Sequence, residues 1–134
     1  MKNRRIVISI AFLALVGTST QQVNAFPQFN GGFKKLYLND DTSEEFKKKV
    51  TKAKCTICHD ETKKTDKGKP DRKFRNPYGQ ALEKLLTKKD KKDKEKIRKA
   101  LEMVEEEKAP DSDETFGERI KNHQLPVEVE TSEE

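Results

Sequence analysis

The sequence has few of the side chains that make metal sites. Its 134 residues include only two cysteines and only two histidines. A structural zinc ion takes four Cys or His ligands, and His123 lies outside the usual ligand spacing from Cys55, Cys58 and His59. The chain also shows no acid–base pair or nucleophile typical of a hydrolase, so we predict that it is not an enzyme.

Apolar residues are scarce as well. Hydrophobic residues make up 31% of the chain and charged residues 40%. This composition approaches that of disordered proteins, and a core built from so few apolar side chains would be marginal.

The one long apolar run, Ile6 to Val16, has 11 residues and is too short to span a bilayer as a helix. It follows Lys2, Arg4 and Arg5 and precedes a polar stretch that ends at Ala25, the order of a secretory signal peptide. We predict cleavage after Ala25, a periplasmic or other extracytoplasmic location, and no stable membrane insertion afterwards. An uncleaved anchor is the alternative.

The net positive charge is modest once the predicted signal peptide is removed. The formal charge of +5, less three basic residues in 1–25, leaves +2 for the mature chain of 109 residues. A nucleic-acid-binding protein needs a strongly basic face with elements that contact the bases, so this balance argues against such a partner.

The most informative stretch is Cys55-Thr56-Ile57-Cys58-His59. Cys-x-x-Cys-His is the attachment signature of c-type haem. On a helix, positions i, i+3 and i+4 share one face, so both thiols can reach the two vinyl groups while the imidazole reaches the iron. A dithiol redox motif and half of a zinc site are the alternatives; the first does not need His59 and usually accompanies a βαβ pattern that is absent here.

With this motif the chain resembles a small monohaem cytochrome c of the class I type. The resemblance implies an all-α fold around covalent haem c, with Cys55 and Cys58 bonded to the porphyrin and His59 as proximal iron ligand. It further implies attachment outside the cytoplasm, and a backbone carbonyl near Pro70 or Pro77 that accepts a hydrogen bond from His59 Nδ1. A bound haem would supply the apolar interior that the composition lacks, so we expect the haem-free chain to be poorly folded.

Apolar spacing and capping residues predict four helices. They run from about Ser43 to His59, from Pro77 to Thr87, from Asp90 or Asp93 to Lys108, and from Phe116 to Lys121 or His123. Further expectations concern the residues around the haem. Phe46 is expected to pack on the last helix; Leu82, Leu85 and Leu86 are expected to line the pocket; Arg72, Arg75 and Tyr78 are candidates for the propionates.

Residues 26–41 contain Pro27 and the pair Gly31-Gly32, which predict irregular structure. Two interpretations remain open for this segment. It is a partly ordered tail, or its apolar residues Phe29, Phe33, Tyr37 and Leu38 pack on the haem or the first helix.

The sixth iron ligand decides between electron transfer and ligand binding. Met103 resembles the class I distal ligand in lying downstream of His59, but it lies about 120° around the helix from Ile97 and the apolar stripe. His123 is the second candidate, and an open site is the third.

We therefore predict a signal peptide at 1–25, an N-terminal extension at 26–41, a cytochrome c-like domain at 42–126 and a disordered acidic tail at 127–134. The expected function is that of a monomeric single-electron carrier. Residues 88–99, with eight basic and three acidic side chains, are either a docking face for acidic redox partners or an ordinary solvated helix. A haem-based ligand binder or sensor is the alternative function, and a dithiol oxidoreductase is a third.

Overall fold

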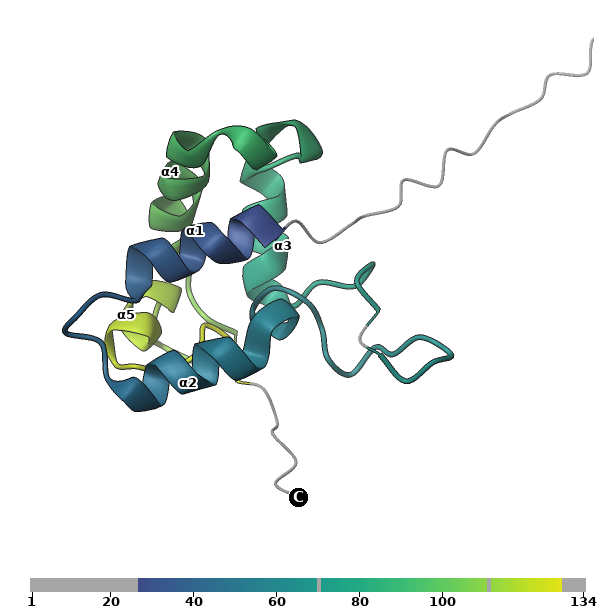
Figure 1. The fold of residues 1–134 in the computed structure, drawn as a ribbon, viewed down its shortest axis with the longest axis horizontal. Coiled ribbons are helices and arrows are strands. Elements are labelled where there is room, and N and C mark those ends of the chain that lie inside the picture. Colours follow the sequence, from purple (N-terminus) through teal and green to yellow (C-terminus); the bar gives the residue numbers. More distant parts are fainter. Residues whose placement is uncertain (1–26, 70, 111, 129–134) are drawn as a thin grey trace, which may run out of the picture.

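The computed structural model describes residues 27–69, 71–110 and 112–128. Helices follow one another through these ranges and pack into one body (Figure 1): α1 (Pro27–Tyr37), α2 (Glu44–Ala53), η1 (Lys54–Ile57), α3 (Pro77–Leu85), η2 (Lys88–Lys92), α4 (Lys94–Val104) and α5 (Phe116–Lys121). The described residues form no sheet, so the all-α prediction is confirmed. The predicted signal peptide and its cleavage site lie outside the described residues. None of the described helices combines the length and apolarity needed to cross a bilayer.

Residues 27–37 form a regular helix, so the prediction of irregular structure there is wrong. Pro27 is the first helical residue, a position where the missing N–H of proline costs no intrahelical bond. Gly32 lies where α1 meets α4, and a Cβ atom at this position would stand 2.6 Å from Ile97 Cγ2. The glycine therefore permits a close helix contact that helix propensity alone does not reveal. Phe33, one residue later, is buried in the core, so α1 belongs to the domain.

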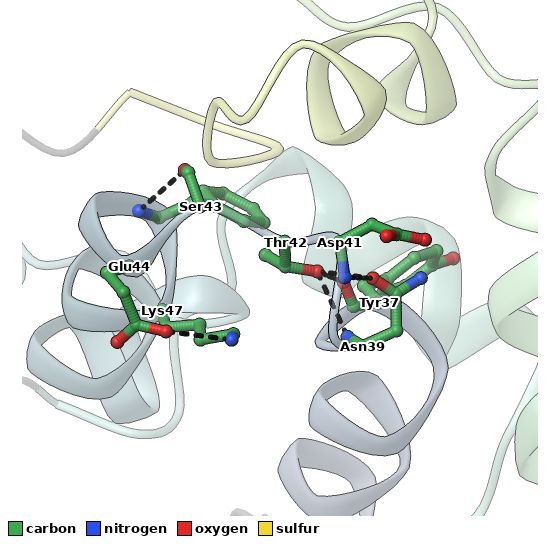
Figure 2. Close-up of polar contacts among 8 residues, drawn as sticks. Tyr37, Asn39, Asp41, Thr42, Ser43, Glu44 and Lys47 are labelled. Carbon is green, nitrogen blue, oxygen red and sulfur yellow. Dashed lines mark hydrogen bonds and ion pairs between the residues drawn. The ribbon is translucent and has the colours of Figure 1, made fainter.

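The turn from α1 to α2 is held by polar side chains (Figure 2). The Thr42 hydroxyl donates to Tyr37 O at 3.0 Å and accepts from Asn39 N at 3.0 Å. Ser43 then caps α2 by accepting a hydrogen bond from Phe46 N at 3.3 Å. The predicted start of this helix is thus confirmed.

The end of that helix differs from the prediction. α2 stops at Ala53, because Lys54 has a positive φ of 47° and begins the 3₁₀ turn η1. Lys54 N still donates to Val50 O, and Asn30 Nδ2 of α1 donates to Lys54 O at 2.8 Å. The chain direction therefore changes one residue before Cys55, and the hydrogen bond from Asn30 of α1 stabilises this turn.

The hydrophobic core is formed by side chains from α1, α2, α3, α4 and α5, whose arrangement is shown in Figure 1. Its largest fully buried side chains include Phe33, Phe46, Tyr78 and Phe116. Tyr78 packs edge-on against Phe33 and Phe116, with ring centroids 6.0 Å and 5.2 Å apart. Most large apolar side chains of the described residues thus belong to one cluster, and Phe74 and Met103 are the exposed exceptions.

α3 and α5 begin at the predicted caps, and α4 begins after Asp93, one of the two predicted caps. Asn76 caps α3, Asp93 caps α4 by accepting from Lys96 N, and Thr115 forms a capping box with Glu118 at α5. α4 ends at Val104 rather than near Lys108, and it buries its predicted apolar positions, Ile97, Ala100, Leu101 and Val104.

The described residues 58–69 and 71–76 connect η1 to α3 without a helix, and the middle of this long loop stands out from the body (Figure 1), while His59 and Asn76 near its ends are buried. At the C-terminal end Val127 is half-buried, and Arg119 Nη2 lies 3.3 Å from Glu128 Oε1. The rest of the predicted tail, 129–134, lies outside the described residues.

Candidate functional site

One cavity of about 640 Å³ lies between the first half of α1, the η1 turn, the long loop and α3. Its volume falls within the range of small-molecule and cofactor pockets. Apolar side chains of Phe29, Leu82 and Leu86 line part of it, and Leu85 is not among its lining residues.

The three motif residues Cys55, Cys58 and His59 all line this cavity. Although α2 has ended, the motif keeps one helical turn, because His59 N donates to Cys55 O at 3.0 Å and Cys58 N donates to the same oxygen at 3.2 Å. The intervening Ile57 is buried in the core, which anchors the turn from its other side. Both thiols and the imidazole are thereby presented to one space.

His59 is buried, and its Nδ1 lies 3.2 Å from Phe74 O in the long loop. The predicted contact with a backbone carbonyl is therefore present, three residues before Pro77. Because a carbonyl only accepts, Nδ1 carries the proton of the neutral ring and Nε2 keeps its lone pair. Burial lowers the pKa of His59, and nearby Arg75 and Arg72 act in the same direction. A neutral imidazole with a free Nε2 is the form that binds a metal.

The two cysteines are not paired with each other. Burial raises the pKa of the Cys58 thiol to about 12, and the neighbouring Cys55 adds to the shift. The thiolate is the nucleophilic form of a cysteine, so Cys58, which stays protonated at neutral pH, is not itself a nucleophile.

Asn76 joins the motif to α3. Its Nδ2 donates to Thr56 O at 2.9 Å and Ile57 O at 3.0 Å, and its Oδ1 accepts from Gly79 N at 2.9 Å. Gly79 lies directly against the motif, since a Cβ atom there would overlap the carbonyl oxygen of Cys58 and stand 2.8 Å from its carbonyl carbon. Only glycine permits this approach.

Positive side chains surround the cavity. Five of its lining residues are basic and only Glu83 is acidic; the basic ones are Lys34, Lys54, Arg72, Arg75 and Lys88. Arg75 Nε contacts Glu83 at 3.2 Å, while its buried Nη1 has no hydrogen-bond partner. A buried donor of this kind fits a ligand that carries an acceptor such as a carboxylate.

The other predicted site residues lie elsewhere. Met103 is 60% exposed on α4 and does not line the cavity. His123 follows α5 and stacks on Phe46, with ring centroids 5.6 Å apart. Tyr78, a candidate for the propionates, is fully buried in the core. Helical geometry explains why Met103 is exposed, because its position on α4 is about 120° around the helix from Ile97.

Sequence reasoning missed Asn30, Lys34 and Gly79 as lining residues. A signal for the first two was available, since positions 27, 30, 31 and 34 share one face of a helix. The glycine pair obscured it by indicating irregular structure.

Among the described residues, no three His, Cys, Asp or Glu side chains are grouped so that they could hold a metal ion. A zinc site made from Cys55, Cys58, His59 and His123 is therefore not assembled. No protein-family model, curated protein sequence or solved structure matches the chain.

Proposed function

We propose that this chain is an exported monohaem c-type cytochrome that carries single electrons between redox partners. The supporting observation is that Cys55, Cys58 and His59 line the same cavity. Two thiols and a neutral imidazole with a free Nε2 are the donor set that covalent haem requires.

The remaining lining residues suit the same group. Phe29, Leu82 and Leu86 offer apolar surface to a porphyrin, and the unpartnered Nη1 of Arg75 offers a donor to a propionate. Arg72, also on the lining, adds positive charge. A bound haem would supply reversible one-electron chemistry, while the protein sets its ligation, burial and surrounding charge.

Backbone and side-chain contacts around the motif also support the proposal. Phe74 O fixes the orientation of the His59 ring, and Asn76 holds the motif turn against α3. The basic rim would attract an acidic partner toward the open side of the cavity, with Lys88 as the first residue of the 88–99 stretch and the only one of that stretch that lines the cavity.

The test is to express the full chain in a host that matures c-type cytochromes. Intact mass and a pyridine haemochrome assay should show one haem bound through two thioethers to the purified protein, and Cys55→Ala/Cys58→Ala should abolish the attachment. Voltammetry should then show a single reversible one-electron wave. A colourless product with two titratable thiols would contradict the proposal and favour the dithiol alternative.

A second function is favoured by one observation: neither Met103 nor His123 lines the cavity. An iron without a strong second protein ligand would bind small molecules such as carbon monoxide, as a ligand sensor does. Carbon monoxide binding to the reduced protein without displacement of a protein ligand would support this function over electron transfer.

A further inference from the structure

Phe74 in the long loop is one of two exposed large apolar side chains among the described residues, and Met103 on α4 is the other. Phe74 is 48% exposed. Burial of an aromatic side chain is favourable, and aromatic residues are enriched where one protein contacts another. The ring of Phe74 therefore offers an apolar contact that the fold only partly buries.

The backbone of Phe74 contacts the motif. Its carbonyl oxygen accepts a hydrogen bond from Asp60 N at 3.2 Å and lies 3.2 Å from His59 Nδ1. Its N–H donates to Asp71 O at 3.1 Å, so both backbone polar groups of the residue are held before any partner binds. A molecule that touches the Phe74 ring is separated from the imidazole only by the backbone of one residue and a hydrogen bond.

The two residues before Phe74 are basic and exposed. No acidic side chain among the described residues forms an ion pair with Arg72 or Lys73. The preceding acidic residue, Asp71, is half-buried, and its carboxylate accepts a hydrogen bond from Lys73 N at 3.0 Å. The surface around the ring is therefore positive, and it is complementary to an acidic partner.

We propose that residues 72–74 form the docking surface for a redox protein whose own surface combines an apolar patch with acidic side chains. The proposal rests on the covalent haem proposed above. Phe74 enters the apolar patch, while Arg72 and Lys73 pair with the surrounding carboxylates. One electron then passes between the two redox centres, so that one is oxidised as the other is reduced. Arg72 also lines the cavity, so this surface continues into the basic rim of the cavity.

The basic stretch 88–99 fits such a partner less well. Three of its basic side chains already pair with acidic ones at 2.8–3.4 Å: Lys96 with Asp90, Arg98 with Glu102 and Lys99 with Glu95. The structure describes all of residues 88–99, and none of them is an exposed large apolar side chain. Only residues 72–74 combine unpaired positive charge with an apolar contact next to the motif.

An anionic membrane offers the same two chemistries but fits this surface less well than a protein. Binding to a bilayer scales with the apolar area inserted, and Phe74 is a single side chain. The long loop also carries Glu61 and Asp66, which an anionic surface repels. The contact between Phe74 O and His59 has a use only for a partner that exchanges electrons.

The binding experiment uses a gold surface coated with a mixed monolayer of carboxylate- and methyl-terminated thiols, which presents both chemistries of the proposed partner. Surface plasmon resonance should show that the matured holoprotein binds this monolayer and that Phe74→Ser weakens the binding about tenfold, the loss typical of an interface hot spot. The matched control is Met103→Ser, which removes the other exposed apolar side chain and should bind like the wild type. Neither substitution removes a buried side chain, so both variants should fold.

The charged part of the surface has its own pair of variants. Lys73→Glu should weaken binding to the monolayer at low salt, and Lys121→Glu on α5, with the same change in charge, should weaken it less. The difference should disappear at high salt, because salt screens exposed charges.

Voltammetry on the same coated gold tests the electron path. The electron-transfer rate constant of the adsorbed protein should fall several-fold in Phe74→Ser and should not change in Met103→Ser. Haem content and the midpoint potential in solution should be equal in the wild type and both variants, which separates docking from damage to the haem site.

Equal binding and equal rates in Phe74→Ser and Met103→Ser would overturn the docking surface, and a bound haem with a reversible wave would then leave the proposed function standing. Binding to phosphatidylglycerol vesicles that depends on Phe74, with no effect of Phe74→Ser on the monolayer, would overturn it in favour of a membrane. Absence of haem from the purified wild type would remove the function and the redox partner together.

Discussion

At the scale of single residues, Asn76 makes more contacts to the motif than its role as a helix cap requires. It caps α3 and also satisfies two carbonyl groups of the motif turn, at Thr56 and Ile57. Asn76 is itself buried, so these groups have little access to water if the side chain is removed. The residue therefore couples the start of α3 to the geometry of the motif.

We expect Asn76→Ala to lower the free energy of unfolding by about 3 kcal/mol, since it removes one cap and two buried hydrogen bonds. Asn76→Ser keeps a capping oxygen but lacks the two donors, so its loss should be smaller by about 1 kcal/mol. Denaturant unfolding of the holoprotein measures both. Equal losses in the two variants would mean that the cap contributes nothing.

Asp90 lies next to the cavity lining, and its titration should make the stability of the folded protein depend on pH. Its carboxylate accepts hydrogen bonds from Lys96 Nζ at 2.8 Å and from Thr87 N at 2.7 Å, and Thr87 is a lining residue. The hydrogen bond from Lys96, followed by those from Thr87, lowers the pKa of Asp90 from 3.8 to about 2.

A carboxyl group with a folded pKa below its unfolded value stabilises the protein above the unfolded value. The contribution of Asp90 should therefore be complete above pH 3.8 and disappear as the pH falls through about 2. Carbon-detected NMR titration of the side chain measures the pKa directly. In Lys96→Met the pKa of Asp90 should rise; a pKa unchanged by this substitution would exclude Lys96 as its main cause.

At the scale of elements, the break between α2 and η1 determines where the motif points. Lys54 has φ 47° and ψ −103°, a conformation that residues with a Cβ rarely adopt. The strain occurs one residue before Cys55, where the chain must turn so that both cysteines line the cavity.

We expect Lys54→Gly to raise the free energy of unfolding by about 1 kcal/mol, because glycine adopts positive φ without the steric penalty. The matched control is Lys52→Gly in the last turn of α2, which should lower it by about 1 kcal/mol. Thermal unfolding of the two holoprotein variants should therefore shift in opposite directions. Shifts of the same sign would show that the turn at Lys54 is not strained.

The sequence predicted those elements that carry their own local signals. The caps at Ser43, Asn76, Asp93 and Thr115 and the apolar stripe of α4 are such signals, and they marked helix starts correctly. The turn at Lys54 has none, because lysine rarely takes positive φ and the side chain that contacts its carbonyl, Asn30, lies 24 residues earlier in the sequence. α1 was missed for a related reason: Gly32 weakens a helix in isolation and is explained only by its contact with α4.

At the scale of the whole molecule, the cavity lies beside the aromatic core rather than at its centre. Phe33, Phe46 and Phe116 are buried among other side chains and do not line the cavity. Composition alone suggested that the haem would form the core, and it could not show that the few apolar residues cluster in this way. The expectation that the haem-free chain is poorly folded is therefore narrowed to the residues around the cavity.

We expect the Cys55→Ala/Cys58→Ala chain to lose structure locally around the cavity. Leu82 and Leu86 would then line an unfilled space, while α4 and α5 keep their contacts with the aromatic core. Hydrogen exchange should become fast in the long loop, at the start of α1 and in α3, and stay slow in α4. Uniformly fast exchange would show that the core depends on the haem after all.

The charge around the cavity differs from the charge of the whole chain. Five basic residues and one acidic residue line the cavity, although the predicted mature chain carries a formal charge of only +2. Salt screens charges beyond about 10 Å at 0.1 M, so a small reactant approaching a haem bound in the cavity, as proposed, would respond to the basic lining residues more than to the net charge. Electron transfer to an anionic complex such as ferricyanide should therefore be fast at low ionic strength and slow as salt is added.

The contribution of the rim can be separated from net charge with two substitutions of equal charge change. Lys88→Glu alters the cavity rim, and Lys121→Glu alters the end of α5, outside the cavity lining. Stopped-flow oxidation of the reduced protein at low salt should slow several-fold in the first variant and little in the second, and the difference should disappear at high salt. Equal slowing in both would show that the anion responds to net charge, and the rim would then lose its role in docking an acidic partner.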